Sequence, residues 1–427
     1  GQLLDCEPIV ATGSGLPVAF IFSGNGAVLA SMAREQYRED KVFHDAFNEL
    51  SRFSIELEGP DLAALLFAED MEAILADGEI AQPMHVAIQI ALCRALGEKG
   101  VRPAACLGHS LGEVSAAVIS GKISARSAME IVLSRTRVFA PLRDTGTMAA
   151  FSASRKAIGE LIDAQSIEAQ VSAENAPKQV TVTGTRSELE ALVKVARAHR
   201  IAGKILDIPY PYHGKAVQSL GDPLRKALHG LKVEIAANDA KFYSGFSGER
   251  HDATALDAEY WVHNALRPVE FRDGIESLIA DGFRIFVEIS PKIITSAYIK
   301  LIAEAQGVAV TVLSTLDPRK PSQRSAANIA RRILAAGGDI DQQQLLGAKS
   351  PYRTVPPVAP FERKTYRLTS SRGPDIFARA PSHPLLGARS EADAWRWRMT
   401  FSTALQPWLA DHRIAGRVLL PATGIIM

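Results

Sequence analysis

The stretch RPAACLGHSLGEVSAAVISG, residues 102–121, decides the fold class. Its apolar run predicts a short buried strand, and the small residues that follow predict a closely packed helix. Gly108 and Gly112 flank Ser110 where the strand and the helix would join. A G-x-S-x-G sequence at such a junction is typical of a strained turn that lifts the serine hydroxyl toward a ligand. Ser110 is therefore a candidate nucleophile, and the alternative is a small residue in a corner that tolerates glycine.

Strands and helices alternate on both sides of this stretch. Residues 18–22 are an apolar run that ends at a glycine-rich turn, and residues 284–290 predict another buried strand after a helix. This alternation favours an α/β fold with a mainly parallel sheet. We expect a large α/β-hydrolase-like subdomain built from residues 18–145 and 209–346.

The segment between these two parts has a different pattern. Strand-like and helical runs follow one another across residues 146–208 in the order β-α-β-β-α-β, which predicts an inserted ferredoxin-like subdomain. Residues 1–17 would precede the fold, and the proline-rich residues 347–380 predict an extended linker. Residues 381–427 form a separate C-terminal segment.

The overall composition excludes several classes of function. Of 427 residues, 47% are hydrophobic and 22% charged, and the 48 basic residues nearly balance the 47 acidic ones. This balance is that of a globular protein with no signal for nucleic acid binding. The three cysteines lie far apart without metal-ligand spacing, so neither a zinc site nor a disulfide is expected. We expect no leader and no membrane-spanning run, and hence a cytoplasmic protein.

A serine nucleophile needs a base, and the most suitable histidine lies far along the chain. His213 stands in the stiff segment DIPYPYHGKAV, residues 207–217, where a cleft between the two subdomains would be lined. A base there could take the proton of Ser110, and a packing role is the alternative. His109, the neighbour of the serine, would point away from it and have a packing or backbone-bonding role.

The stretch SARSAMEIVLSRTRVFAPL, residues 124–142, predicts a helix that carries an arginine on its apolar side. Ser124 is a suitable N-cap, and Pro141 ends the helical pattern. At about 100° per residue, Arg135 falls among the apolar side chains, whereas Arg137 falls on the opposite side. A guanidinium is costly to bury without a partner. Arg135 would therefore either form an internal salt bridge or bind a substrate carboxylate through two parallel hydrogen bonds.

Together these motifs resemble the malonyl-CoA:acyl-carrier-protein acyltransferase family, in the form found within type I polyketide synthases. The resemblance covers residues 18–345. The segments that carry it, in chain order, are FSGNGAVLASMA, AQPMHVAIQIAL, GHSLGE, AENAPKQVTVTG, YPYHG, FYSGFSGE, YWVHNALRPVEF and FVEISPK. Arg135 stands 25 residues after Ser110, at the family's position for the arginine that binds the extender carboxylate.

The resemblance implies a transferase with a serine–histidine dyad and a ping-pong mechanism. Ser110 would be acylated by malonyl-CoA with His213 as general base, and the phosphopantetheine thiol of an acyl carrier protein would then accept the malonyl group. Asn264 in YWVHN matches the residue that orients the histidine. The backbone N–H groups of Asn25 and Leu111 match the oxyanion hole. No permanently bound cofactor and no metal are implied.

Other positions bear on the choice of extender unit or depart from the family's pattern. Leu111 resembles malonyl-selective members. Tyr212 is a bulky aromatic where methylmalonyl-selective members carry a serine, whereas Tyr210 resembles those members. A ring at Tyr212 would leave little room for a C2 methyl, so malonyl is expected. The departures are Asn25 for a glutamine, Ser290 for a glycine and Lys292 for a frequent histidine.

Residues 381–427 resemble the start of a polyketide dehydratase domain of the double-hotdog type. His412, Gly416 and Pro421 fit its H-x-x-x-G-x-x-x-x-P motif, in which the histidine is the base. The partner acid of that family lies further downstream, so we expect this segment to make structural contacts and to perform no dehydration. The order of the two domains implies a multienzyme with a ketosynthase before the acyltransferase.

Two other functions fit parts of the sequence. A serine hydrolase or thioesterase would use the same pentapeptide, but such enzymes place an acid between the serine and the histidine and have no reason to bury an arginine. A non-catalytic docking domain would explain the departures at Asn25 and Ser290. The sequence favours acyl transfer over both.

Overall fold

The computed structural model of the protein describes residues 14–26, 32–70, 74–233, 235, 238–252, 256–316, 325–347, 386–389, 395–399, 401–404 and 406–421. The chain forms two compact units, residues 1–349 and 350–427. The expected leading segment, residues 1–17, and the expected linker, residues 347–380, lie almost wholly outside the described residues.

The first unit is built around a five-stranded sheet. Its order is β7-β2-β1-β8-β9, and every neighbouring pair is parallel. Phe22, the last residue of β1, pairs with Gly108 on one side and with Ile289 on the other. The carboxyl ends of three strands therefore meet at one edge of the sheet, which is where open α/β sheets place their ligands. The strands are β1 (Val18–Phe22), β2 (Ala105–Gly108), β7 (Lys241–Tyr243), β8 (Ile285–Ile289) and β9 (Thr311–Ser314).

Helices bury both faces of this sheet. Phe20 and Phe22 pack into a large core on one face, and Ala19 and Ile21 pack into a second core on the other. Burial on both faces explains why β1 is a continuous apolar run. The large core takes side chains from α1 (Met32–Glu39), α2 (Lys41–Glu56), α3 (Leu62–Leu65), α5 (Gly78–Glu98), α6 (Gly112–Ile119), α7 (Ala125–Phe139), α10 (Lys215–Gln218), α11 (Gly221–Ala227), α12 (Ala258–Leu266) and α15 (Ala326–Ala335), and the second from α13 (Phe271–Ala280) and α14 (Thr295–Ala305).

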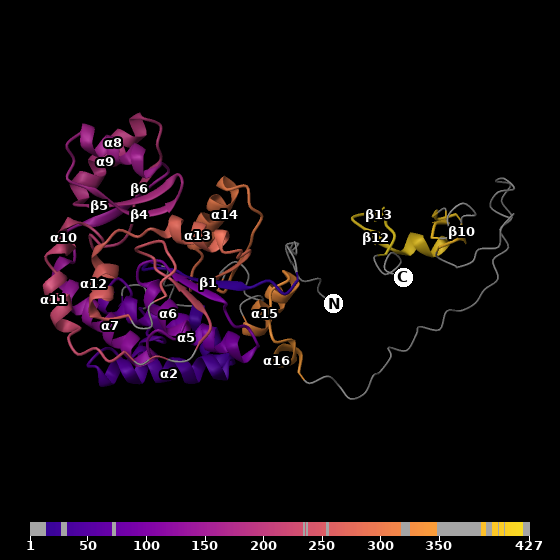
Figure 1. The fold of residues 1–427 in the computed structure, drawn as a ribbon, viewed down its shortest axis with the longest axis horizontal. Coiled ribbons are helices and arrows are strands. Elements are labelled where there is room, and N and C mark those ends of the chain that lie inside the picture. The colour runs from indigo at the N-terminus through magenta and orange to yellow at the C-terminus, as the bar shows by residue number, and fades with distance from the viewer. Residues whose placement is uncertain are drawn as a thin grey trace. The chain divides into compact units, whose positions relative to one another are not determined.

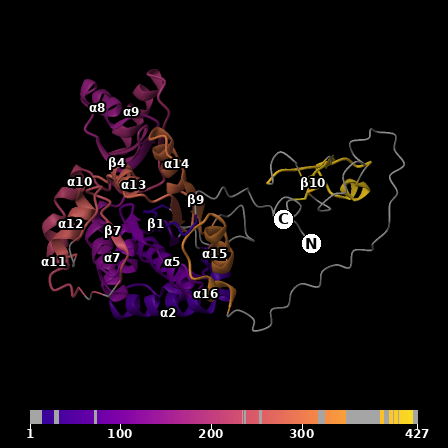
Figure 2. The ribbon, with the colours of Figure 1, turned by 45° about the vertical axis from the view of Figure 1, so that its right-hand side comes forward.

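A four-stranded antiparallel sheet forms the other part of this unit. The element order β-α-β-β-α-β that we expected across residues 146–208 is observed, and the sheet order is β4-β5-β3-β6. Its helices lie at one end of the unit, and α2 lies at the opposite end (Figures 1 and 2). The elements are β3 (Thr147–Phe151), α8 (Arg155–Ala164), β4 (Gln170–Ala176), β5 (Gln179–Gly184), α9 (Arg186–Ala198) and β6 (Gly203–Ile205).

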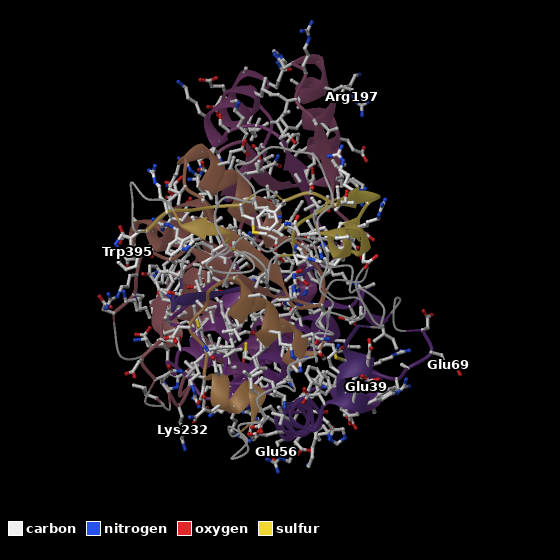
Figure 3. All side chains as sticks on the ribbon, turned by 90° about the vertical axis from the view of Figure 1, so that its right-hand side faces the viewer. Glu39, Glu56, Glu69, Arg197, Lys232 and Trp395 are labelled. Atoms are coloured by element: carbon white, nitrogen blue, oxygen red, sulfur yellow. The ribbon has the colours of Figure 1, made fainter. Side chains whose placement is uncertain are left out.

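Charged side chains cover the outside of the first unit. Glu56 at the end of α2, Arg197 at the end of α9 and Lys232 are exposed and point outward in Figure 3. The last described helix of this unit is α16 (Gln342–Leu346).

The second unit contains two short hairpins in its described residues. β10 (Ala388–Arg389) pairs with β11 (Trp397–Arg398), and β12 (Arg413–Ile414) pairs with β13 (Arg417–Val418), both antiparallel. A 3-10 helix, η4 (Pro407–Asp411), precedes the second hairpin.

Candidate active site

Ser110 lies on a strained turn between β2 and α6. Its backbone has a φ of 51°, in the left-handed region that a residue with a side chain rarely adopts. The turn leaves no room for side chains at its two glycines. A Cβ on Gly108 would lie 2.1 Å from the Cα of Glu113, and one on Gly112 would lie 2.3 Å from the carbonyl oxygen of Phe22. The pentapeptide therefore has the geometry of a nucleophile turn, with the serine at the edge of the sheet.

His213 reaches this serine from 103 residues further along the chain. The Oγ of Ser110 lies 2.7 Å from the Nε2 of His213. The Nδ1 of His213 lies 2.8 Å from the backbone carbonyl oxygen of Arg267. Because a carbonyl can only accept, Nδ1 carries the proton and Nε2 is free to accept the serine proton. Burial, together with the charge of Arg135, lowers the pKa of His213 to about 3, so the ring is neutral near pH 7.

The structure corrects the role expected of Asn264. The group that orients His213 is the backbone carbonyl of Arg267. Asn264 instead accepts a hydrogen bond from Arg135 at 3.2 Å and donates one to the backbone carbonyl of Ser110 at 3.3 Å. A backbone partner carries no side-chain signature, which is why the sequence could not reveal it.

Arg135 faces the nucleophile, as the helical pattern predicts. Ser124 caps α7 through the N–H of Ser127, and Arg135 is buried with 4% of its surface exposed. Its Nη2 lies 3.4 Å from the Oγ of Ser110. Within the described residues its guanidinium forms no ion pair with a carboxylate, and its Nε has no hydrogen-bond partner. The internal salt bridge that we considered is therefore not present among these residues.

Sequence reasoning missed a buried carboxylate behind the site. Glu113 lies on α6 with no exposed surface and accepts hydrogen bonds from Asn264 at 2.6 Å, from the N–H of Gly245 at 3.0 Å and from the hydroxyl of Tyr260. Burial raises the pKa of Glu113 to about 7, and these donors oppose that rise. The available signal was one charged residue in the otherwise small and apolar helix GEVSAAVI.

A pocket of about 450 Å³ opens onto Ser110 and His213. Its walls come from the turn after β1, from β3 to β6 and from the start of α14. Asn25 lines it, with its own side chain accepting a hydrogen bond from the N–H of Gly26 at 2.9 Å. The backbone N–H groups of Asn25 and Leu111 have no protein acceptor among the described residues. The oxyanion hole expected of these two groups stays a prediction.

Two parts of the chain match known protein families. Residues 19–340 match the acyl transferase domain family, and residues 383–427 match the polyketide synthase dehydratase domain. The chain belongs to the acyl transferase domain family. The resemblance drawn from the motifs is thereby confirmed.

Curated relatives of this acyltransferase chain are large polyketide synthases. Polyketide synthase GfsE of Streptomyces halstedii is 29% identical over 422 residues, which are 96% of this chain and 11% of that protein. Spectinabilin polyketide synthase system protein NorA of Streptomyces orinoci is 30% identical over 99% of this chain and 23% of its own length. The chain thus spans less than a quarter of the length of these two relatives.

Solved structures of acyltransferases share the fold. The acyltransferase domain from the second module of the salinomycin polyketide synthase is 28% identical, with a TM-score of 0.69 over 78% of this chain and 77% of that one. The malonyl CoA-acyl carrier protein transacylase from Clostridium perfringens is 25% identical, with a TM-score of 0.64 over 75% of this chain and 99% of that one.

Of the three residues expected to influence extender choice, only Tyr212 lines the acyltransferase pocket with its side chain. Its ring centre lies 5.9 Å from the Arg135 guanidinium carbon, and its hydroxyl accepts a hydrogen bond from Gln82 at 2.8 Å. Tyr210 stacks behind it at 5.2 Å and is not part of the pocket wall. The side chain of Leu111 is buried in the large core. Any effect of the Tyr210 or Leu111 side chain on the choice of acyl group would therefore be indirect.

The departures from the family's pattern fit this fold without strain. Ser290 is buried and accepts a hydrogen bond from the hydroxyl of Ser23 at 2.6 Å, while its own N–H bonds to Thr315. Its φ is not positive, so no glycine is needed at this position. Lys292 is exposed and lines the pocket.

His109 was expected to point away from the serine. In the structure it bonds to Asn175 at 2.8 Å and lines the same pocket as Ser110.

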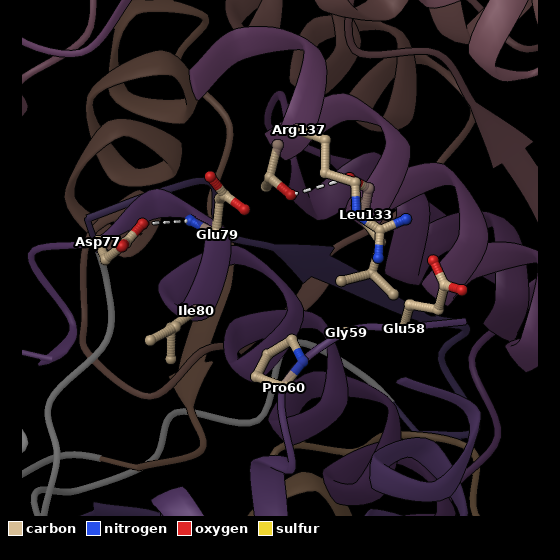
Figure 4. Close-up of a pocket in the computed structure, with 9 residues that line it drawn as sticks. Glu58, Gly59, Pro60, Asp77, Glu79, Ile80, Leu133 and Arg137 are labelled. Carbon is tan, nitrogen blue, oxygen red and sulfur yellow. Dashed lines mark hydrogen bonds between the residues drawn. The ribbon is translucent and has the colours of Figure 1, made fainter. Parts of the chain in front are cut away.

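A second pocket of the acyltransferase, of about 320 Å³, has no serine, cysteine or histidine among its lining residues (Figure 4). It lies between the start of α5 and the last turns of α7 and is lined by charged and apolar side chains, among them Glu58, Asp77 and Arg137. Within the described residues, no group of histidine, cysteine, aspartate or glutamate could hold a metal ion, and no helix is long and apolar enough to cross a membrane.

His412 begins the second hairpin of the C-terminal unit. Its Nδ1 lies 2.9 Å from the carbonyl oxygen of Leu419. Ala415 and Gly416 both have positive φ, 49° and 76°, and form the two-residue turn. Such turns favour glycine because both central residues are left-handed. The hairpin turn therefore explains why the motif has a glycine at position 416 in this chain.

Proposed function

We propose that this chain transfers a malonyl group from CoA to the phosphopantetheine thiol of an acyl carrier protein. The observation that carries the proposal is the Arg135 guanidinium, which lies 3.4 Å from the Ser110 hydroxyl and has no carboxylate ion-pair partner among the described residues. A buried guanidinium next to a nucleophile can bind the free carboxylate of an acyl group such as malonyl through two parallel hydrogen bonds. An acetyl group would leave the guanidinium without that partner.

The first half-reaction would acylate the serine. Nε2 of His213 takes the proton from the Ser110 hydroxyl, the Oγ–C bond forms, and the C–S bond of malonyl-CoA breaks. His213 then gives its proton to the departing CoA thiolate. The N–H groups of Asn25 and Leu111 would stabilise the oxyanion between these steps.

The second half-reaction would reverse this chemistry with a different thiol. His213 takes the proton of the carrier protein's phosphopantetheine thiol, the S–C bond forms, and the Oγ–C bond of the malonyl-serine breaks. The proton on His213 then returns to Ser110.

The charge of Arg135 lowers the pKa of His213. A malonyl carboxylate on Arg135 would offset that charge and make His213 a stronger base in the loaded enzyme.

The finer assignments belong to the same proposal. Tyr212 would exclude a C2 methyl and so favour malonyl over methylmalonyl. The four-stranded sheet of residues 146–208 would be the ferredoxin-like subdomain of a larger α/β-hydrolase-like acyltransferase, and residues 381–427 the first part of a hotdog-like dehydratase domain. Carrier protein, ketosynthase and dehydratase domains of one cytoplasmic multienzyme would be its partners, which the polyketide synthase names of the relatives and the dehydratase match support.

The test is covalent labelling with radioactive malonyl-CoA. The parent chain should incorporate one label on Ser110 and lose it to an added carrier protein that bears phosphopantetheine. Ser110→Ala should incorporate none. Labelling of Ser110→Ala at the rate of the parent, or release of free malonate much faster than transfer, would refute the proposal, and the second outcome would favour a hydrolase.

A further inference from the structure

We propose that Glu113 is a positioning residue that holds the Arg135 guanidinium and the Ser110 turn in one arrangement through the side chain of Asn264. The inference rests on the proposed malonyl transfer and concerns how the malonyl carboxylate is distinguished from an acyl group that lacks one. Glu113 contacts no part of the pocket itself. Among the hydrogen bonds of its side chain, the route from the Glu113 carboxylate to Arg135 and to the Ser110 carbonyl runs through Asn264.

The hydrogen bonds around Asn264 connect all four groups. The Nδ2 of Asn264 donates to Glu113 at 2.6 Å and to the backbone carbonyl of Ser110 at 3.3 Å, and its Oδ1 accepts from Arg135 at 3.2 Å. Asn264, Arg135 and Glu113 are all buried. Water cannot replace a lost partner freely at such a depth, so each bond constrains the next.

The chemistry of the partners fixes which way the amide points. Arginine can only donate, so the oxygen of Asn264 must face Arg135. A backbone carbonyl can only accept, so the nitrogen of Asn264 must face the Ser110 carbonyl, and the same nitrogen donates to Glu113. The other carboxylate oxygen of Glu113 accepts from the N–H of Gly245 at 3.0 Å and from Tyr260. Glu113 therefore has acceptors on both sides, which a neutral amide could not provide.

In Glu113→Gln we expect the directions of the hydrogen bonds at Asn264 to reverse. The glutamine oxygen would pair with the fixed N–H of Gly245, so its NH₂ group would face the NH₂ group of Asn264. Asn264 would relieve this conflict by turning over, and it would then present its NH₂ group to Arg135, which also only donates. The guanidinium would lose its tether, and the Ser110 carbonyl would lose a donor.

The experiment compares kcat/KM for loading of Ser110 by malonyl-CoA and by acetyl-CoA. In Glu113→Gln we expect the malonyl-to-acetyl ratio to fall about 10- to 100-fold, as is typical when a supporting residue is lost and a binding group moves. In an Arg135→Ala background the same substitution should leave the ratio unchanged, because the group it positions is gone. Equal losses for both substrates would show a purely structural role and overturn the inference.

A second pair of variants applies if Glu113→Gln does not fold, as judged by circular dichroism. Tyr260→Phe removes one donor from Glu113 and keeps the carboxylate. Tyr243→Phe is its control, because Tyr243 is also buried and donates to another carboxylate, that of Asp281. We expect the malonyl-to-acetyl ratio to fall about threefold in Tyr260→Phe only. The same ratio in both variants would overturn the inference. A parent chain that takes up no label would instead refute the proposed function itself.

Discussion

His213 and His412 stand in different units and make the same local bond. Each brings Nδ1 within hydrogen-bond distance of a backbone carbonyl, at 2.8 Å for His213 and 2.9 Å for His412. Only His213 is deeply buried, with 2% of its surface exposed, and only its Nε2 meets a hydroxyl. The Nε2 of His412 has no hydrogen-bond partner within the described residues. An imidazole oriented by a carbonyl is therefore not enough for a catalytic base. At His213 the hydroxyl on the second nitrogen and the exclusion of water both come from distant parts of the fold.

The largest expected effect separates these two histidines directly. His213→Ala should lower the rate of malonyl labelling of Ser110 about 1,000-fold or more, because the serine loses its base. His412→Ala should leave the rate unchanged. Both rates can be measured by rapid quench with labelled malonyl-CoA, and a comparable loss in the two variants would contradict the comparison.

Substitution of Arg135 tests whether Ser110 and His213 alone determine which acyl group is accepted. Arg135→Ala should lower kcat/KM for malonyl-CoA about 100-fold, the effect of removing one partner from a buried charge pair, and should leave acetyl-CoA relatively favoured. Arg137→Ala is the matched control, since Arg137 lies two residues later on α7, is exposed and bonds the carbonyl of Leu57. Unchanged malonyl kinetics in Arg135→Ala would show that this arginine is structural.

The pH dependence of loading tests whether burial and Arg135 keep His213 neutral. Burial and Arg135 lower the pKa of His213 to about 3, so protonation removes the base only near that pH. The His213 ring should therefore stay neutral from about pH 8 down to about pH 5, so loading should show no loss centred at about pH 6.5, where an unperturbed histidine becomes protonated. Arg135→Ala should move the protonation of His213 to higher pH, because a nearby positive charge is removed. A parent profile with its midpoint near the ordinary histidine pKa would contradict the site geometry.

The smallest expected effect concerns the pocket wall. Tyr212→Ser should raise kcat/KM for methylmalonyl-CoA about fivefold relative to malonyl-CoA, since accommodating one methyl group in a partly opened pocket is worth about 1 kcal/mol, the lower end of the usual range. Tyr212→Phe is the control, because it keeps the ring and removes only the hydroxyl that bonds Gln82. Competition between the two CoA esters measures the ratio. No change in Tyr212→Ser would remove Tyr212 from the choice of extender.

Much of the fold was predictable from local patterns. The strands at Val18–Phe22 and Ala105–Gly108, the capped helix Ala125–Phe139 and the inward direction of Arg135 all follow from runs, caps and helical periodicity. These features depend on neighbouring residues in the chain, and a single sequence contains that information. The serine turn belongs to the same group, because two glycines are sterically required at Gly108 and Gly112.

The partners of the site residues depend on how distant segments pack. The sequence predicts a strained turn at Ser110 and an arginine that faces inward on the next helix. It could not determine that a backbone carbonyl at Arg267 orients His213, or that Glu113 and Asn264 connect the turn to Arg135. A carbonyl is present at every residue and a buried glutamate has many possible donors, so the choice among them depends on which distant segments the packing brings together.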